Sequence, residues 1–258
     1  APTVSVRGEN QPSLNLPDQP GSGLLRVPYE IFFAAQDPGD DTVTDWRVVW
    51  DEATFNASDP STYEVFGSGT TSAMHSYELL GTSTIRVFAI DEDFTSADFV
   101  LDSAFAGQHQ VNIGVSSDQI SAGGPYSISE GETLKLEGTA VGDDLGLVKS
   151  YSWDINGDGI FGDGGITTAA DSISWNELQQ LNNVPIQDDG SFNTVSVRVN
   201  YLNGPVIDSA PSTLFVSNTA PTITIGAVSA VTENGMLTLS GTMTDPSAVD
   251  TFTLTLNW

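Results

Sequence analysis

The residues best suited to chemistry lie in one short acidic turn, residues 154–160, with the sequence DINGDGI. Oxygen-bearing side chains alternate there and are followed by glycine, as in the first half of a calcium-binding EF-hand loop, whose seventh position offers a backbone carbonyl. The twelfth position is Gly165 and not a bidentate Glu, so a further acid must complete the ligand set. The calcium ligands predicted from this pattern are Asp154, Asn156, Asp158, Ile160 and Asp163.

The same turn also fits a purely structural interpretation. Asn and Gly readily adopt positive φ, and Asp caps backbone N–H groups, so DINGDGI is also typical of a β-hairpin turn without metal. From the sequence, both interpretations of this turn stay open.

A second candidate calcium site lies where an expected strand ends in three consecutive acids. Asp91 and Asp93 could bind calcium there together with an acid from another loop, Asp37, Asp40 or Asp41. A solvated strand end is the alternative, because runs of charge usually face water. Calcium is the predicted cofactor at both sites.

No catalytic residues are predicted. The sequence has no cysteine, and its two histidines, His75 and His109, lie far apart, so thiol chemistry and a zinc cluster are not expected. It has no Gly-x-Ser-x-Gly elbow, phosphate loop or dinucleotide fingerprint. Carboxylate pairs that could hydrolyse a glycoside arise by chance among 34 Asp and Glu and carry little information. We expect that the chain is not an enzyme.

The charge of the chain limits its partners. Seven Lys and Arg against 34 Asp and Glu give a formal net charge of −27, which repels nucleic acid and anionic membrane surfaces. The same acidic excess suits divalent cations or solubility in saline surroundings. No apolar run is long enough to span a bilayer, so we expect no nucleic-acid partner and no membrane insertion in this segment.

Three segments that end in tryptophan are expected to form the framework that positions these turns. They run from Asp37 to Trp50, from Asp143 to Trp153 and from Asp245 to Trp258. Alternate residues before each tryptophan are mostly large and apolar, which is the period of a strand with one face in a core. We therefore predict that Trp50, Trp153 and Trp258 are core residues.

Other strands follow from the same alternation. Residues 24–35 are expected to form one strand, and residues 83–90 a strand with one face in the core. In the strand 133–138, Lys135 should face water while its leucine neighbours face inward. A single helical turn is expected at 176–181, and the scarcity of other helical patterns predicts an all-β fold.

The sequence landmarks repeat at a spacing of about 100 residues, which suits one folded domain per repeat. Ala-Pro-Thr opens the chain and recurs at position 220, ahead of the third tryptophan segment. The predicted domains are residues 1–116, 117–218 and 219–258. The last is a truncated repeat of roughly 40 residues, near the limit below which an apolar core cannot hold itself together. It would need strands from more of the same chain or from a neighbour, and both ends look like cuts in a longer polypeptide.

Several short stretches of the second repeat resemble a known family. They are AGGPY at 122–126, EGE at 130–132, YSWDINGDG at 151–159 and TVSVRV at 194–199. Together they are similar to a PKD-type repeat, the polycystic-kidney-disease-like Ig fold. The resemblance implies tandem Ig-like antiparallel β-sandwiches, used in large extracellular proteins such as adhesins, surface-layer and filament proteins, and secreted hydrolases with accessory modules.

Two departures from the family pattern limit what is carried over from it. The first repeat has WDEA at 50–53 where the family often has an Asp/Gly-rich turn, and the second has NYLN at 200–203 where acids are usual. A site at either place is therefore not assumed in both repeats.

These patterns predict the structural repeat region of a large secreted cell-surface protein, as an adhesin, filament or surface-coat component. Its partners would be neighbouring modules of the same chain, and the open third repeat would allow self-assembly into filaments by strand complementation. The alternative is a polysaccharide-binding or accessory module of a secreted hydrolase, with aromatic residues exposed along one face. Tyr126, Phe161 and Trp175 would be the open stacking residues in that case.

Overall fold

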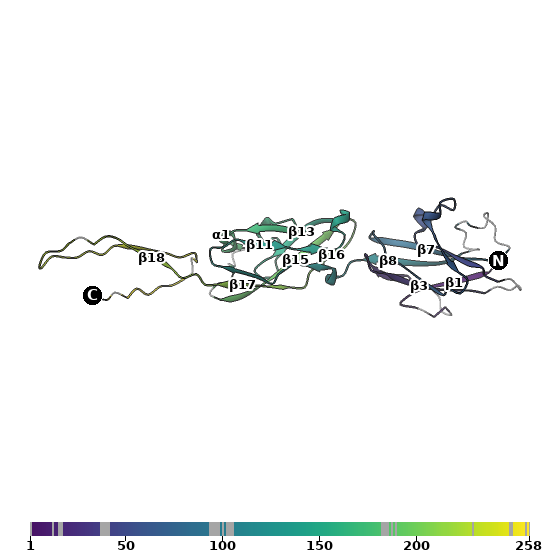
Figure 1. The fold of residues 1–258 in the computed structure, drawn as a ribbon, viewed down its shortest axis with the longest axis horizontal. Helices are drawn as coiled ribbons and strands as arrows, with labels where there is room; N and C mark the ends of the chain where they lie inside the picture. The colour runs from purple at the N-terminus through teal and green to yellow at the C-terminus, as the bar shows by residue number, and fades with distance from the viewer. Residues whose placement is uncertain are drawn as a thin grey trace. The chain divides into compact units, whose positions relative to one another are not determined.

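The structure is a computed structural model that describes residues 2–11, 13–14, 18–36, 42–92, 99, 101, 106–181, 186, 188, 190–228, 230–247, 250–255 and 257. The chain folds into two compact units (Figure 1). Unit 1 comprises Ala1–Gln119, Val141–Lys149 and Asn200–Ile207, and unit 2 comprises Ile120–Ala140, Ser150–Val199 and Asp208–Trp258. Each unit contains three separate segments of the sequence, whereas each predicted domain is one continuous range. The predicted domain boundaries therefore stay a prediction.

Unit 1 is a β-sandwich of two sheets. The smaller sheet has the order β1 (Thr3–Gly8), β3 (Tyr29–Gln36), β6 (Ser72–His75). The larger sheet has the order β2 (Gly21–Leu24), β8 (Gly107–Gly114), β7 (Gly81–Ile90), β4 (Asp45–Val49), β5 (Glu64–Gly67). Only the β2–β8 pair of the described strands in this unit is parallel. Three short 3₁₀ turns, η1 (Glu52–Thr54), η2 (Pro60–Thr62) and η3 (Ser117–Gln119), lie in connections.

The two sheets of unit 1 enclose an apolar core. Its members come from alternate positions of the strands, as the period-two pattern predicts, and include Val6, Ile31, Phe33, Trp46, Val48, Ile85, Val87, Val111 and Ile113. Phe33 and Trp46 meet across the two sheets with ring centroids 4.8 Å apart. Inward packing of alternate residues from both sheets is the arrangement expected of an Ig-like sandwich.

The face of β7 that was predicted to lie in the core is buried, and near the end of the strand the opposite face is buried as well. Phe88 and Ile90 point away from the main core and form a second apolar cluster with Val49 and Phe99. Phe55, from the excursion after β4, packs edge-on against Phe99 at 5.0 Å. The polar-looking excursion thus folds back over the outer face of the larger sheet.

The predicted single strand at 24–35 is divided into β2 and β3. Arg26 adopts a left-handed conformation with φ of 59°, which an extended strand does not allow. Its N–H donates to the carbonyl of Tyr77 at 2.9 Å, and Val27 N–H donates to Leu24 O at 3.1 Å. Chain reversal at Arg26 therefore moves the chain from the larger sheet to the smaller one.

The later sandwich repeats the strand order of the first. Its main sheet has the order β10 (Tyr126–Ser129), β17 (Ser212–Ser217), β15 (Ser191–Tyr201), β13 (Val148–Asp154), with β16 (Val206–Asp208) also on β15. The first pair, β10 with β17, is parallel, as β2 with β8 is in unit 1. Shorter pairs join β11 (Leu134–Glu137) to β14 (Ala170–Ile173) and β9 (Ile120–Ser121) to β12 (Thr139–Ala140). The shared order confirms the predicted all-β, Ig-like class and supports a repeated module.

The core of the later sandwich follows the predicted alternation. Leu134 and Leu136 are buried on β11 and Lys135 between them is exposed. The expected helical turn is α1 (Trp175–Leu178), which begins one residue and ends three residues earlier than predicted, and Ser174 and Glu177 cap its start reciprocally. The remaining 3₁₀ turns are η4 (Asp143–Leu145) and η5 (Asp163–Gly165). Among the described residues, no helix has the length and apolarity needed to cross a lipid bilayer.

The last part of unit 2 is a hairpin of β18 (Thr222–Ile225) and β19 (Gly241–Thr244), and all residues of both strands are exposed. The prediction of a third tryptophan strand at 251–257 was wrong for the residues described there, which form no strand. Phe252 and Leu254, expected to face a core, are 40% and 69% exposed. A strand needs a neighbour for its backbone hydrogen bonds, and none of the described strands pairs with this segment.

Candidate functional site

The acidic turn after β13 is closed by hydrogen bonds from its own backbone. Asp154 accepts from Gly157 N–H through Oδ1 at 2.8 Å and from Gly159 N–H through Oδ2 at 3.0 Å. Asp158 Oδ1 accepts from Ile160 N–H at 2.7 Å. Gly157 has a φ of 74°, and a Cβ there would lie 1.9 Å from Thr194 Oγ1, so the turn requires this glycine.

The other predicted ligands of this turn lie on both sides of it. Asp163, at the start of η5, is buried and accepts from Ile155 N–H at 2.7 Å. Asn156 Oδ1 accepts from Asp158 N–H at 3.1 Å, and the Ile160 side chain is exposed. The structure therefore brings the five predicted residues into one hydrogen-bonded turn, and calcium binding by this turn stays a prediction.

The electrostatics of the turn favour a positive partner. Burial raises the pKa of Asp163, and the nearby carboxylates of Asp154 and Asp158 raise it further. Asp154 is itself buried. Three acids therefore share a small, partly desolvated region, where a cation would relieve their mutual repulsion.

The second predicted calcium site is described only in part. Asp91 follows β7 and is buried, with 7% of its surface exposed. Asp93, Asp37, Asp40 and Asp41 lie outside the described residues. The convergence of these loops stays a prediction.

The structure places Trp50 and Trp153 in buried cores. Trp153 is 0% exposed, and its indole N–H donates to Thr168 O at 3.0 Å. Trp50 stacks on His75 with ring centroids 4.9 Å apart. Trp258 lies outside the described residues.

The aromatic residues considered for sugar stacking are engaged with the protein. Trp175 is buried and donates its indole N–H to Pro246 O at 2.8 Å. The guanidinium of Arg198 covers the ring of Phe161 at 4.0 Å from its centroid. The hydroxyl of Tyr126 donates to a backbone carbonyl and also accepts from Glu137 N–H at 3.0 Å. These rings therefore do not form an open stacking platform.

A buried polar triad in unit 1 was not predicted from the sequence. His109, on β8, is 1% exposed, with Nε2 2.8 Å from the hydroxyl of Tyr29 and Nδ1 2.8 Å from Asp18 Oδ1. The rings of Tyr29 and His109 are nearly parallel, with centroids 5.9 Å apart. Burial raises the pKa of Tyr29 to about 12, with smaller contributions from Glu9 and Asp18. The neutral, enclosed phenol therefore acts as a hydrogen-bonding group and not as a nucleophile.

Two glycines make room for this triad. A Cβ at Gly8 or at Gly21 would lie 1.8 Å from the Tyr29 hydroxyl oxygen. A small pocket of about 150 Å³ beside them is lined by Tyr29 and His109. The only signal in the sequence was a histidine at an inward-facing strand position, and its partners lie 80 and 91 residues away.

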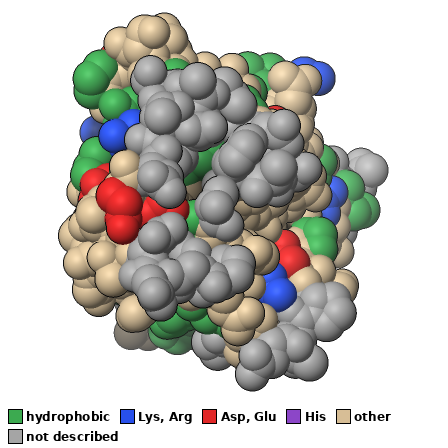
Figure 2. Space-filling view, turned by 90° about the vertical axis from the view of Figure 1, so that its right-hand side faces the viewer, with side chains coloured by type: hydrophobic (Ala, Val, Ile, Leu, Met, Phe, Trp, Pro, Cys, Tyr) green, Lys and Arg blue, Asp and Glu red, His purple; other side chains and the backbone are tan. Residues whose placement is uncertain are grey.

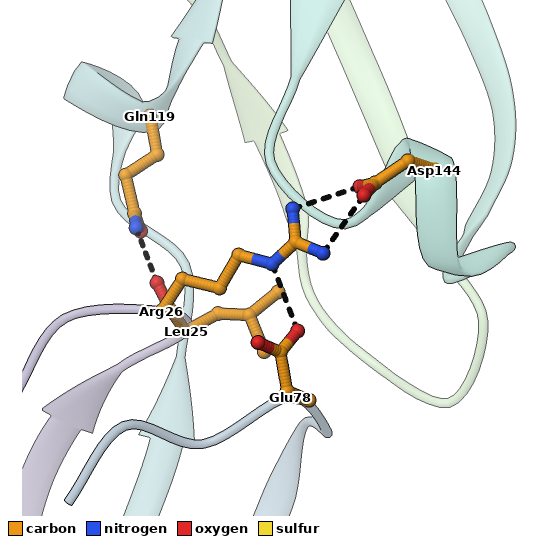
Figure 3. A network of polar contacts seen from close by, with 5 residues as sticks. All are labelled: Leu25, Arg26, Glu78, Gln119 and Asp144. Atoms are coloured by element: carbon orange, nitrogen blue, oxygen red, sulfur yellow. Dashed lines mark hydrogen bonds and ion pairs between the residues drawn. The ribbon is translucent and has the colours of Figure 1, made fainter.

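A second unpredicted network lies around Arg26, within unit 1 (Figure 3). Its guanidinium makes two parallel hydrogen bonds to Asp144 on η4, at 2.9 and 2.8 Å, and Nε donates to Glu78 at 2.8 Å. Gln119 donates its side-chain amide to the carbonyl of buried Leu25 at 2.7 Å. These contacts hold η3, η4 and the loop between β2 and β3 together.

Replacing Arg26 should change the titration of Asp144. The hydrogen bonds from Arg26 lower the pKa of Asp144 below its ordinary value, so the pair stabilises the fold above the ordinary carboxyl pKa. That stabilisation is lost as the pH falls through the lowered pKa. In Arg26→Gln we expect the pKa of Asp144 to rise toward its ordinary value, measured by carbon-detected NMR of the Asp carboxyls.

Asp59 provides the control for this titration. Its pKa is also lowered, but by hydrogen bonds from Ser61, so it should titrate identically in both proteins. An unchanged titration of Asp144 in the variant would contradict the assigned role of Arg26.

The arginines of the chain are already matched with acids. The closest N–O distances are 3.9 Å for Arg7–Asp18, 2.8 Å for Arg26–Asp144, 3.9 Å for Arg47–Asp45, 2.9 Å for Arg86–Glu52 and 2.6 Å for Arg198–Asp208. In Figure 2, acidic side chains lie in small groups, and the group on the right lies beside a Lys or Arg side chain. Arginines that face acids do not form a phosphate-binding surface.

Comparison with known proteins gave structural neighbours of low similarity. No protein-family model and no curated protein sequence matches the chain. Fibronectin(III)-like modules of Clostridium thermocellum CbhA match 83% of this chain and 94% of theirs, at 10% identity and a TM-score of 0.28. A match to a putative membrane anchored protein from Corynebacterium diphtheriae covers 93% of this chain and 67% of that protein, at 10% identity and a TM-score of 0.32. A match to extracellular domains 3–5 of Drosophila OTK covers 78% of this chain and 59% of that chain, at 15% identity and a TM-score of 0.29. We transfer no function from similarities this low.

Proposed function

We propose that the chain is a run of PKD-type Ig-like modules from a secreted cell-surface protein, in which it serves as a spacer or assembly unit. In this role it is not an enzyme, and its partners are neighbouring modules of the same chain. Each sandwich contributes length and a cooperative barrier to unfolding. The resemblance of the second repeat to PKD modules and the repeated strand order support this proposal.

The observation that carries the proposal is that the side chains best able to do chemistry hold the fold together. His109 links Tyr29 to Asp18 inside unit 1. Arg26 ties a loop to η4, and Asp154 closes its own turn. His109 and Asp154 are buried, and buried hydrogen-bonded groups make a fold rigid and specific. Such use of polar side chains suits a protein whose work is mechanical.

Calcium at the acidic turn is part of this proposal. Asp154, Asp158 and Asp163 lie in one hydrogen-bonded turn, where the pKa of Asp163 is raised mainly by its burial and further by the two neighbouring carboxylates. Oxygen ligands of this kind suit calcium, and a bound ion would stiffen the connection that follows β13. A calorimetric calcium titration of Asp158→Asn tests this site, because the variant should bind one equivalent of calcium fewer than the natural sequence.

Pulling the full chain by its two ends tests the mechanical role. We expect at least two separate unfolding steps, because a sandwich of about 100 residues releases roughly 300 Å of chain at about 3.3–3.6 Å per residue. Extension without any resisted step would contradict the proposal. Retention of the full chain by a polysaccharide gel would instead support the alternative, an accessory module that binds glycans.

Self-assembly by strand addition is a second candidate function, and the β18–β19 hairpin favours it. Apolar side chains line a hollow of about 250 Å³ on this hairpin, and Ile223, Ile225, Met243 and Leu254 are 43–69% exposed. We propose that a strand from a second copy covers this face, since exposed apolar hairpins pair readily with other chains. Sedimentation should show mass rising with concentration in the natural sequence and not in Ile225→Lys. A constant monomer mass would contradict strand addition.

A further inference from the structure

Three carboxylates of unit 2 converge although they lie far apart in the sequence. Glu130 follows β10, whereas Asp245 and Asp250 follow β19. One ligand atom from each lies within 4.8 Å of the other two. Glu130 is only 3% exposed and is fixed by Thr219, whose N–H donates to Oε2 at 2.9 Å and whose hydroxyl donates to the Glu130 carbonyl at 3.1 Å.

The turn that carries Asp245 is anchored to the sandwich by two hydrogen bonds and closed by a third within the turn. Trp175 donates its indole N–H to Pro246 O at 2.8 Å. Ser247 donates its hydroxyl to buried Asp188 at 2.9 Å and its N–H to Asp245 Oδ1, also at 2.9 Å. The carboxylate of Asp245 is therefore held in place next to Glu130 by contacts that do not involve a metal.

The remaining oxygen of Asp245 indicates that a ligand belongs at this cluster. Asp245 Oδ2 is buried and accepts no hydrogen bond from any described residue. A buried carboxylate oxygen without a partner is strongly destabilising unless a cation or a donor compensates it. The nearby negative charges of Glu130 and Asp250 disfavour a bare carboxylate at this place further.

The chemistry of the three side chains selects a hard cation. All three donors are carboxylates, which suit calcium, whereas zinc prefers nitrogen and sulfur ligands in a tetrahedral set. Calcium–oxygen distances of about 2.3–2.6 Å allow two oxygens on one ion to be up to about 5 Å apart. The three ligand atoms lie within 4.8 Å of one another, so small side-chain movements bring them to these distances from one common ion.

We infer that Glu130, Asp245 and Asp250 bind one calcium ion. The ion bridges the end of β10 to the segment after β19, and backbone carbonyls and water complete its shell. This site shares no residue with the acidic turn at 154–163 and does not depend on it. Calcium therefore orders the last segment of unit 2 against the sandwich.

Calorimetric titration of the full chain with calcium tests this site. The variant is Asp245→Asn, which removes the charge but keeps the side-chain oxygen that accepts from Ser247 N–H. We expect it to lose one equivalent of bound calcium, or to bind that equivalent more than about 10-fold more weakly. Asp118→Asn, which removes the same charge from an exposed position on η3, should bind as the natural sequence does.

Two further variants separate the possible outcomes. Asp250→Asn removes a second ligand from the same site, and it decides the result if circular dichroism shows that Asp245→Asn is misfolded. Asp158→Asn removes a ligand only from the acidic turn. If this variant binds one calcium equivalent fewer, the lost ion belongs to the acidic turn and not to the cluster of Glu130 with Asp245. The inference is overturned if the natural sequence binds no calcium, or if well-folded Asp245→Asn and Asp250→Asn bind as many equivalents as it does.

Discussion

Trp153→Ala should destabilise the later sandwich by about 3–5 kcal/mol, the cost typical of removing a large aromatic side chain from a core. The ring is 0% exposed, and its N–H bond to Thr168 O would be lost as well. Gly138 faces this ring so closely that a Cβ there would lie 2.9 Å from it, so the surroundings are shaped to the indole. Denaturant unfolding followed by circular dichroism measures the loss of stability.

Phe192→Ala is the matched control for this substitution. It removes an aromatic ring from β15 in the same unit, but that ring is 71% exposed and contacts mainly Phe215, at 5.0 Å between centroids. We expect a change below about 1 kcal/mol. Equal effects of the two substitutions would mean that Trp153 is not a core residue.

His109→Ala should destabilise unit 1 by about 2–4 kcal/mol, from a cavity and from polar groups that lose a buried partner. The Tyr29 hydroxyl and Asp18 each lose a 2.8 Å contact, and Tyr29 is itself buried. Thermal and denaturant unfolding of the full chain measure this loss.

The control for His109 is its neighbour on the same strand. Gln110→Ala changes an exposed side chain of β8 and should alter stability by less than about 0.5 kcal/mol. If His109→Ala is as stable as Gln110→Ala, the triad does not lock the sandwich. A cleavage activity lost in His109→Ala while stability stays the same would point instead to a chemical role.

The fold class could be predicted because it depends on alternation along single strands. Leu134, Lys135 and Leu136 alternate inward and outward as their pattern predicted, and Trp153 occupies the core. Each of these assignments needs only residues close in sequence. The recurrence of Ala-Pro-Thr and of the tryptophan segments predicts the domain boundaries, which stay a prediction.

The features that were missed depend on contacts between distant residues. The division of the predicted strand at 24–35 arises from Arg26 at positive φ, which is uncommon for a residue with a side chain. The burial of Phe88 on the outer face of β7 arises from packing by residues outside the strand, among them Phe55 and Phe99. Neither can be recognised from local periodicity, because in both cases a separate segment supplies the packing.

The candidate sites divide in the same way. The turn at Asp154 was found because its predicted ligands lie within ten residues of one another in the sequence, and its geometry as a turn follows from its glycines. The His109 triad and the cluster of Glu130 with Asp245 combine residues from separate strands and loops. Their chemistry becomes visible only once the sheets place these residues side by side.

Hydroxyl-radical footprinting of the full chain, read by mass spectrometry, tests most directly whether the aromatic side chains serve the interior and not a ligand. Each residue's oxidation rate is compared between the native chain and the chain in denaturant. Strong protection is expected for Trp50 and Trp153, and little for Met236, which is 91% exposed. Native oxidation of Trp50 and Trp153 at the rates of the unfolded chain would contradict the account of these modules as structural sandwiches.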